Sequence, residues 1–352
     1  MKTIIEKAKD HLQKQQPFVL YKQPDANTVS GLFQLDAKTY TCVDYSEKGF
    51  VFAPFNTQED VFFIPFDKAD LFVAPWTPKE IIECPNIISK SLEKEKETHV
   101  QLVQKGINQI GLGDFKKVVL ARKESVALTN FNLEDVFSQM TSRYTNAFVY
   151  AWFHPKTGLW MGASPETLVK INEAYFETMS LAGTQQISES LDHIDWGAKE
   201  KEEQLLVTQF IQEQLYPVSS SLSIGEVQTA KAGNLLHLRT KIHGEVLKGL
   251  PVVKTLIEKL HPTPAVCGLP RDKAKQFILS QEANNRKYYS GFLGLLNTSD
   301  LQSELYVNLR CMELSGDIAN LYIGGGITQE SDPEKEWEET VAKSLVMKKV
   351  LS

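Results

Sequence analysis

Cysteine is scarce in this chain of 352 residues, and long apolar runs are missing. The four cysteines at positions 42, 84, 267 and 311 have no CxxC spacing, so neither a zinc site nor a disulfide framework is predicted. No stretch of 18 apolar residues exists that would predict a membrane-spanning helix. The charged N-terminal segment lacks the apolar core of a signal peptide. We therefore expect a cytoplasmic protein with reduced thiols.

Glycine-rich nucleotide motifs are also missing, since neither GxGxxG nor a Walker sequence occurs. The net charge of −6 argues against nucleic acid or an acidic membrane as a partner. Apolar residues make up 42% of the chain and charged residues 23%, as in soluble globular proteins. We expect a monomer whose partner is a small molecule.

Strand patterns mostly follow one another, and helix patterns are interspersed irregularly. Strands are predicted at 18–21, 31–33, 49–52, 60–64, 117–122, 147–153, 166–171, 235–246, 291–296, 304–314 and 318–323. Helices are predicted at 1–15, 89–110, 133–141, 198–215, 251–260, 271–282 and 334–350. This order favours an α+β fold with large, mainly antiparallel β-sheets over a βαβ repeat.

Two of the predicted helices each carry a pair of glutamates three residues apart, Glu200 with Glu203 and Glu336 with Glu339. Residues at this spacing lie on one helix face. Glutamate-rich helices are usually solvated faces, so either pair alone is weak evidence. Four carboxylates that face one another would repel unless a cation lay between them, and oxygen-only ligands favour Mg²⁺.

The sequence also contains a candidate general base and a candidate general acid. Lys117 opens an apolar strand, where it either blunts a strand edge or serves as a buried amine with a lowered pKa. Glu166 follows the turn Gly162–Pro165 at the head of another strand. A buried carboxyl there would suit a general acid, although the segment could equally be a simple bend before a strand.

Several further features could bind an anion. The segment Ser180–Thr184 is predicted as a small-residue loop, and Gly324–Gly326 closes a strand where backbone N–H groups could approach a carboxylate. Arg310, predicted within a mostly apolar strand, needs an internal carboxylate or a substrate anion. Lys343 either pairs with a glutamate one turn earlier or binds substrate. His237 in a strand is more often structural than catalytic.

These motifs, in this order, resemble the chorismate-utilising enzymes, a family of isochorismate synthases, salicylate synthases and the large subunits of anthranilate and aminodeoxychorismate synthases. The resemblance covers about residues 95–350. It rests on KVVLAR (117–122), GASPE (162–166), LAGT (181–184), KEKEEQLLV (199–207), HLRT (237–240), HPTPAVCG (261–268), RKYYSGFLG (286–294), NLRC (308–311), IGGGI (323–327) and EWEETVAK (336–343).

The resemblance implies a two-lobed sandwich of the sheets, flanked by helices. It implies one large domain over 1–352, with 1–94 as the variable N-terminal part and 95–352 as the chorismate-binding catalytic part. Glu203 and Glu339 match direct magnesium ligands, and Glu200 and Glu336 match carboxylates that hold the metal's waters.

The resemblance also assigns the catalytic and substrate-binding positions. Lys117 matches the general base and Glu166 the general acid. The matched substrate-binding positions are Gly183, Thr184, His237, Thr240, Ala265, Tyr289, Arg310, Gly324, Gly326 and Lys343.

Three positions favour one activity within the family, namely isochorismate synthase. Lys117 favours addition of water, because amine-adding members tend to carry glutamine there. Ala182 stands where some aminodeoxychorismate synthases carry a nucleophilic lysine. The segment Pro264–Gly268 is similar to that of isochorismate synthases. Gln204 departs from the histidine found in many members, which concerns the surroundings of the metal rather than the metal itself.

The expected reaction is Mg²⁺-dependent conversion of chorismate to isochorismate, by water addition at C2 and loss of the C4 hydroxyl. One alternative is a salicylate synthase, in which the same site goes on to eliminate pyruvate. The others are an amine-adding synthase subunit, which would need a glutaminase segment not recognisable here, and a binder without activity. The product could feed menaquinone or siderophore synthesis.

Overall fold

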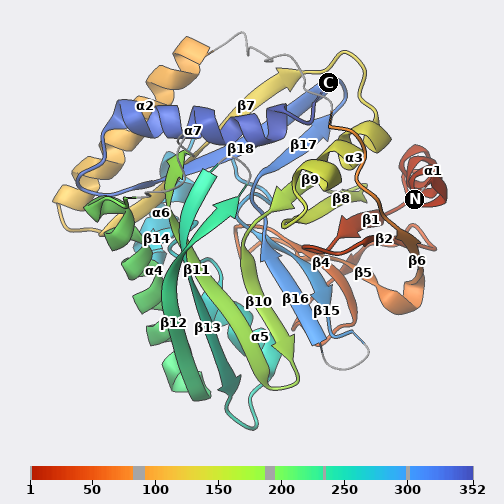
Figure 1. Cartoon of the computed structure of the whole chain (residues 1–352), viewed down its shortest axis with the longest axis horizontal. Helices are drawn as coiled ribbons and strands as arrows, with labels where there is room; N and C mark the ends of the chain where they lie inside the picture. The colour runs from red at the N-terminus through yellow and green to blue at the C-terminus, as the bar shows by residue number, and fades with distance from the viewer. Residues whose placement is uncertain (1, 82–91, 187–194, 233–234, 299–301, 352) are drawn as a thin grey trace.

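Two nine-stranded sheets carry the fold (Figure 1). The computed structural model describes residues 2–81, 92–186, 195–232, 235–298 and 302–351. All pairings between the described strands are antiparallel. The predicted α+β class with large antiparallel sheets is therefore confirmed. None of the described helices is long and apolar enough to cross a membrane.

The bounds of the elements are as follows. The first sheet contains, in order across it, β14 (Gly268–Leu269), β7 (Lys117–Ala127), β18 (Ile318–Ile327), β17 (Cys311–Ser315), β9 (Gly158–Ser164), β8 (Phe148–His154), β1 (Phe18–Lys22), β2 (Thr28–Gln34) and β6 (Ala69–Pro75). The second contains β12 (Ser219–Ala232), β13 (Leu235–Val246), β11 (Tyr175–Gln186), β10 (Thr167–Asn172), β16 (Gln302–Val307), β15 (Phe292–Leu296), β4 (Gly49–Ala53), β5 (Phe62–Pro65) and β3 (Tyr40–Thr41). The helices are α1 (Lys2–Gln13), α2 (Leu92–Gly111), α3 (Leu133–Arg143), α4 (Ala198–Leu215), α5 (Val252–Leu260), α6 (Arg271–Gln281) and α7 (Pro333–Lys348), with short 3₁₀ turns at Phe66–Lys68 and Tyr216–Val218.

An aromatic layer joins the two sheets. Trp152 of the first sheet stacks on Phe52 of the second with 5.0 Å between ring centroids, and Phe148 stacks on Tyr306 at 4.2 Å. All four side chains are buried and belong to one cluster with residues from both sheets. The other face of β8 packs toward α3, so both faces of this strand are buried. This explains why its sequence is a continuous apolar run rather than an alternation.

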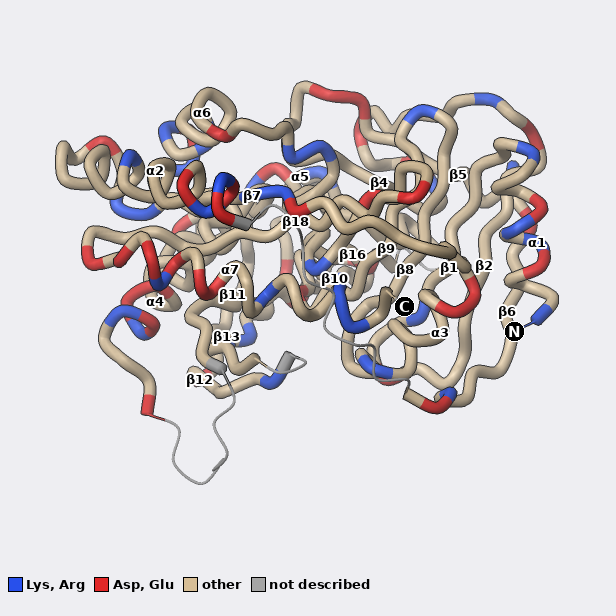
Figure 2. The backbone as a smooth tube through the Cα atoms, turned by 90° about the horizontal axis from the view of Figure 1, so that it is seen from above, with Lys and Arg blue, Asp and Glu red and all other residues tan. Residues whose placement is uncertain are grey.

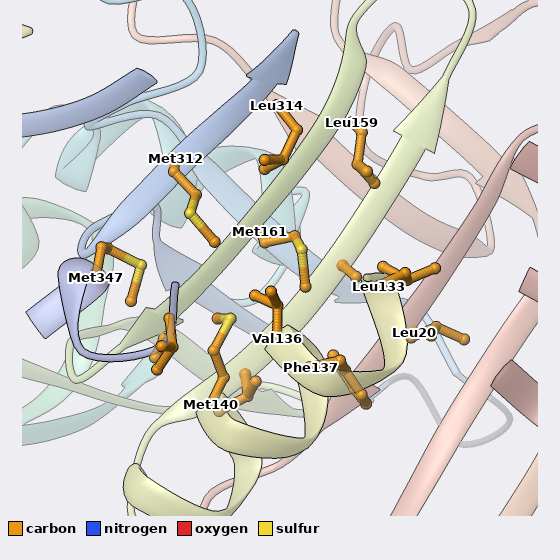
Figure 3. Packing of buried hydrophobic residues seen from close by; sticks show 14 of the residues in the cluster. Leu20, Leu133, Val136, Phe137, Met140, Leu159, Met161, Met312, Leu314 and Met347 are labelled. Carbon is orange, nitrogen blue, oxygen red and sulfur yellow. The ribbon is translucent and has the colours of Figure 1, made fainter. Parts of the chain in front are cut away.

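The outer face of the first sheet is covered by α1, α3 and the end of α7 (Figure 3). Phe137 and Met140 of α3 point onto the strands that carry Met161 and Met312, and Met347 reaches the same cluster from α7. The outer face of the second sheet packs against α4 and α5. The order of layers is therefore helices, sheet, sheet, helices, which places α4 and α7 on different sheets.

The prediction of a single strand at 304–314 is wrong. The chain leaves the second sheet after Val307 and enters the first sheet at Cys311, so Asn308–Arg310 form a crossover between sheets. Arg310 takes a positive φ of 48°, which breaks the strand even though the sequence pattern continues. The prediction that Arg310 lies within a strand is wrong for the same reason.

A second crossover lies beside the first. The chain leaves the first sheet after Ser164 and enters the second at Thr167, so the predicted bend is confined to Pro165–Glu166. The two crossovers are hydrogen-bonded to each other: Ala163 N donates to Arg310 O at 3.0 Å, and Val307 N donates to Glu166 O at 3.0 Å. The candidate acid and the candidate anion-binding arginine thus lie at the junction of the sheets.

Two other local predictions are corrected. Ser180–Thr184 is not a loop but part of β11, with an irregularity in its pairing to β13 between Ala182 and Thr184 and a φ of 73° at Gly183. The strand expected to close at Ile323 continues to Ile327, and each of its glycines pairs with β7. The small residues of β11 and β18 leave space that side chains of neighbouring elements occupy.

Candidate active site

One cavity collects side chains from both sheets, both crossovers and two helices. Its volume is about 60 Å³. It is lined by Val119, Pro165, Glu166, Leu181, Ala182, Gly183, Thr184, Glu203, His237, Ala265, Val266, Tyr289, Leu309, Arg310, Gly324, Gly326 and Lys343. Nine of the ten predicted substrate-binding residues are in this set, all but Thr240. The predicted acid and one predicted metal ligand also line the cavity.

Lys117, at the start of β7, is not itself a lining residue but lies next to the lining residue Glu203. The side chain is fully buried, and its Nζ lies 2.8 Å from Glu203 Oε1. Both side chains lie over Gly326 of β18, where an added Cβ would overlap Glu203 Oε1 and stand 3.2 Å from Lys117 Cε. Any side chain at this position would collide with the pair, so the glycine makes room for it. The amine is thus neither solvated nor at a free sheet edge.

Glu166 is almost completely buried at its crossover, with 3% of its surface exposed. Burial raises the pKa of Glu166 to about 8, and the charges of Lys117 and Arg310 only partly oppose this shift. Ser164 Oγ accepts the Glu166 N–H at 3.3 Å, and this hydroxyl donates to Val307 O. The backbone around the acid is therefore held firmly, and the carboxyl is mostly protonated at neutral pH.

Three glutamates on α4 and α7 are paired with lysines. The ion pairs are Lys117–Glu203 at 2.8 Å, Lys343–Glu339 at 2.5 Å and Lys199–Glu336 at 2.5 Å. The last pair joins α4 to α7, and Figure 2 shows the acidic segments of both helices at the same end of the molecule. Burial alone would raise the pKa of Glu203, but Lys117 and the other lysines outweigh it, so that this pKa is lowered.

These glutamates have the chemistry of a divalent-cation site. Glu336 is buried, and its Oε2 has no hydrogen-bond partner in the part of the chain that the structure describes. A Cβ on Gly325 would be 3.4 Å from that oxygen and 4.0 Å from Glu339 Oε1, while Glu203 lies over the next glycine. The three carboxylates thus lie along one glycine segment of β18, and a cation is one partner that the unpartnered buried oxygen could take.

The glutamate carboxylates are ion-paired with lysines and do not meet at one common point. Over the described ranges, no three acidic, histidine or cysteine side chains are grouped closely enough to hold a metal ion. The Glu200 carboxylate lies at the start of its own helix, where its Oε2 would be 2.5 Å from a Cβ on Gly197. The donor set fits Mg²⁺ in kind, and its lysine pairs would have to open for the carboxylates to meet.

A hydrogen bond of His237, which lines the cavity, defines which of its ring nitrogens carries the proton. Its Nδ1 lies 2.9 Å from Gly183 O, and because a carbonyl only accepts, Nδ1 carries the proton. Nε2 is therefore an acceptor, and it has no partner among the described residues. Burial lowers the pKa of His237 to about 3, so the ring is neutral at physiological pH. Thr184 Oγ1 lies 3.4 Å from the same Nδ1.

A buried polar network next to the cavity involves a residue to which sequence analysis gave no role. Gln204 Nε2 carries two N–H groups and lies within hydrogen-bond distance of three hydroxyl oxygens, Ser180 Oγ at 3.1 Å, Thr208 Oγ1 at 3.0 Å and Thr240 Oγ1 at 2.7 Å. Thr240, predicted to bind substrate, points into this network and is not a lining residue. The network fixes α4 against β11 and β13 one residue from Glu203. In the sequence, Gln204 was notable only because many members of the family carry histidine at this position.

We expect Gln204→Leu to destabilise the fold by about 2 kcal/mol, because it leaves buried hydroxyls without their donor. The free energy of unfolding, measured with urea, checks this. Gln209→Leu on the exposed face of the same helix is the matched control, and we expect it to change stability by less than about 0.5 kcal/mol. Equal effects of the two substitutions would show that the network does not stabilise the helix.

The geometry agrees with the comparisons with known proteins. A family model described as "Chorismate binding enzyme" matches residues 69–352. The chain belongs to this family. Among chorismate-binding enzymes it is 32% identical to the isochorismate synthase MenF of Escherichia coli K12, over 73% of this chain and 61% of that protein. It is 30% identical to the salicylate biosynthesis isochorismate synthase of Pseudomonas aeruginosa, over 71% of this chain and 54% of that protein.

The fold is also shared with solved chorismate-binding enzymes. The crystal structure of DhbC from Bacillus anthracis superposes with a TM-score of 0.83 over 99% of both chains, at 22% identity. The segment 1–94, expected to be the variable part, contributes β1, β2 and β6 to the first sheet and β3, β4 and β5 to the second. The aligned part of this chain spans between half and two thirds of the two curated relatives' lengths.

Proposed function

We propose that this chorismate-binding enzyme is an isochorismate synthase. The observation that carries the proposal is the buried Glu166, whose pKa is raised to about 8, on a cavity that is also lined by Glu203, the ion-pair partner of Lys117. A protonated carboxyl and an amine at one small polar site suit the exchange of one hydroxyl for another. The named relatives among isochorismate synthases support the same reaction.

In the proposed mechanism Glu166 is the general acid. It gives its proton to the C4 hydroxyl of chorismate as that group leaves as water. A carboxyl with an ordinary pKa would have lost this proton at neutral pH, so burial is what makes the step possible. Arg310, which lines the cavity from the neighbouring crossover, is proposed to bind a substrate carboxylate, and neutral His237 is proposed to accept a hydrogen bond from a substrate hydroxyl through Nε2.

Lys117 is the proposed general base. It takes a proton from the water that attacks C2, which requires the amine to leave its ion pair with Glu203 and to be neutral. Tyr289 and the backbone at Gly324 line the same cavity and are proposed to hold substrate carboxylates. Lys343, another lining residue, donates to Gly324 O at 3.0 Å and is proposed to turn to a substrate carboxylate on binding.

Mg²⁺ is the proposed cofactor, with Glu203 and Glu339 as direct ligands and Glu200 and Glu336 holding its waters. When bound, the metal supplies positive charge for the ring carboxylate of the substrate. The position of three carboxylates along the glycine segment of β18 and the unpartnered oxygen of Glu336 support this assignment. For Glu200 the side chain would have to rotate away from Gly197.

The test is incubation of the purified protein with chorismate and Mg²⁺, with and without EDTA, followed by chromatography of the products. We expect isochorismate, formed only when free metal is present. Lys117→Ala and Glu166→Gln are each expected to lower kcat at least 100-fold while the proteins stay folded by circular dichroism. Near-wild-type turnover of both variants would overturn the roles given to these residues.

The other products separate the alternatives. Salicylate would indicate that the site continues to pyruvate elimination, and anthranilate in the presence of ammonium would indicate an amine-adding enzyme. No product would indicate a binding protein. We further propose that the chain works as a monomeric cytoplasmic enzyme without a glutaminase subunit, as one domain over 1–352, and that its product serves menaquinone or siderophore synthesis.

A further inference from the structure

Arg286 and Glu282, in the segment that follows α6, form a buried ion pair outside the candidate active site. Their side chains are 3% and 4% exposed, and neither belongs to the described residues that line the cavity. Arg286 Nε donates to Glu282 Oε2 at 2.8 Å, and Nη2 donates to Oε1. The cost of burying two charges offsets most of their attraction, so such a pair is weak evidence for stability. Its distinguishing property is the fixed geometry of its donors and acceptors.

The ion pair completes an edge of β7. Among the described strands, the pairing of β14 with β7 ends at Val118. Beyond that point Val119 O accepts from Arg286 Nη2 at 2.7 Å, and Ala121 N donates to Glu282 Oε1 at 2.8 Å. The pair therefore offers the strand one donor and one acceptor, as a neighbouring strand would. It fixes the position of β7 relative to the segment after α6.

The guanidinium of Arg286 also holds a second backbone segment. Its Nη1 donates to Val266 O at 2.8 Å and lies 3.4 Å from Ser290 Oγ. Together with the contacts to Glu282 and Val119, these give all five N–H groups of the guanidinium an acceptor. A planar group with every donor engaged has one orientation. Arg286 therefore holds β7 and the turn at Val266 at a fixed separation.

The groups that Arg286 holds form one wall of the candidate active site. Val119 and Val266 line its cavity, and so does Tyr289, whose N–H donates to Arg286 O at 2.9 Å. A Cβ added at Gly324 would lie 2.7 Å from Tyr289 Oη and 3.5 Å from Val119 Cγ1. This wall therefore borders the glycine whose backbone is proposed to hold a substrate carboxylate.

We propose that Arg286, oriented by Glu282, is a positioning residue for substrate binding. The inference rests on the proposed function, since it concerns how chorismate fits the same cavity. Arg286 does not touch the substrate. It sets the separation of β7 from the turn at Val266, and the fit of the ligand depends on that separation. Glu166 lies on the crossover between the sheets, so loss of the guanidinium weakens binding more than it slows the chemical step.

Arg286→Lys tests this role, because it keeps the positive charge beside Glu282 but loses the planar group that reaches two carbonyls. The Kd for chorismate is measured with Mg²⁺ in the Glu166→Gln background, in which turnover is expected to be abolished. KM and kcat are measured with Glu166 intact. We expect Kd and KM to rise about tenfold, as loss of one charged hydrogen bond would cause, and kcat to change less than about threefold. A role in stability alone would lower the folded fraction, and therefore kcat, and would leave Kd and KM unchanged.

Arg271→Lys is the matched control. Arg271 also donates to backbone carbonyls, those of Glu258, Lys259 and His261, and none of these residues lines the cavity. We expect this substitution to leave the Kd and KM for chorismate unchanged. Equal Kd values for Arg286→Lys and Arg271→Lys would overturn the proposal.

A second variant covers the case in which Arg286→Lys does not fold. Glu282→Gln places an amide N–H₂ group against the guanidinium and is expected to raise the Kd as well, so an unchanged Kd in this variant also overturns the proposal. If the Glu166→Gln reference itself does not bind chorismate, the proposed function fails and this inference fails with it. Tight binding by the reference that Arg286→Lys leaves unchanged overturns this inference alone.

Discussion

Glu166→Gln is expected to abolish turnover and also to flatten the pH dependence of stability. In the wild-type protein the folded-state pKa of Glu166 is about 8, above the 4.5 of a free glutamate. A raised pKa in the folded state contributes stability that is fully present below pH 4.5 and is lost as pH rises toward 8. The slope of this loss is about 1.4 kcal/mol per pH unit for a single proton. Glutamine has no proton to lose, so the variant lacks this slope.

Urea unfolding of both proteins between pH 5 and 8 measures the effect. The difference in free energy of unfolding between Glu166→Gln and wild type should grow with pH in favour of the variant, by a few kcal/mol over this range. Glu226→Gln, at an exposed position, is the control and should leave the slope unchanged. Wild-type turnover should fall as pH rises through about 8, because the acid is then deprotonated. A pH-independent difference would mean that Glu166 is ionised in the folded protein.

The helices were predictable because their signals are local. The helix predicted at 198–215 is α4 as observed, and those predicted at 133–141, 251–260, 271–282 and 334–350 lie within two residues of α3, α5, α6 and α7. Asp332 followed by Pro333 is a strong start signal, and the structure shows the Asp332 side chain accepting from the next free backbone N–H groups. Short-range periodicity and caps were sufficient for these elements.

Strands were harder to predict because their register depends on distant partners. β12 was missed, because its sequence is rich in serine and threonine and most of its side chains are exposed at the edge of the second sheet. β11 was assigned in part to a loop, because small residues that make room for α4 resemble turn residues. The crossover at Asn308–Arg310 interrupts a run with strand-like composition, and only pairing with two different sheets reveals it.

The candidate site shows the same division between local and distant information. The motifs named most of the residues that line the cavity, and their roles stay predictions until they are tested. The motifs could not predict which charged side chains form ion pairs. The pair of Lys199 and Glu336, for example, joins positions 137 residues apart. Gln204 was noted only as an unusual residue, whereas its hydrogen-bonding environment of Ser180, Thr208 and Thr240 requires the packed fold.

Substitution of Lys117 by methionine is expected to make the stability of the protein depend strongly on Mg²⁺. The ammonium is fully buried and lies 2.8 Å from Glu203, whose side chain is 14% exposed. Without Lys117 the Glu203 carboxylate loses its buried counter-charge, which should cost on the order of 3 kcal/mol in the absence of metal. A cation bound by Glu203 and Glu339 would replace that charge.

Thermal or urea unfolding of Lys117→Met with EDTA and with saturating Mg²⁺ measures this without any assay of activity. A ligand at about 100 times its Kd stabilises a folded protein by about 2.7 kcal/mol, so Mg²⁺ should recover most of the loss. It should stabilise the wild type less, because there the metal must first displace Lys117 from Glu203. Lys170→Met, which breaks the partly exposed pair with Glu304, is the control and should cost less than about 1 kcal/mol with or without metal. If Mg²⁺ stabilises all three proteins equally, Glu203 is not a ligand, and the glutamates of α4 and α7 serve to neutralise the lysines instead.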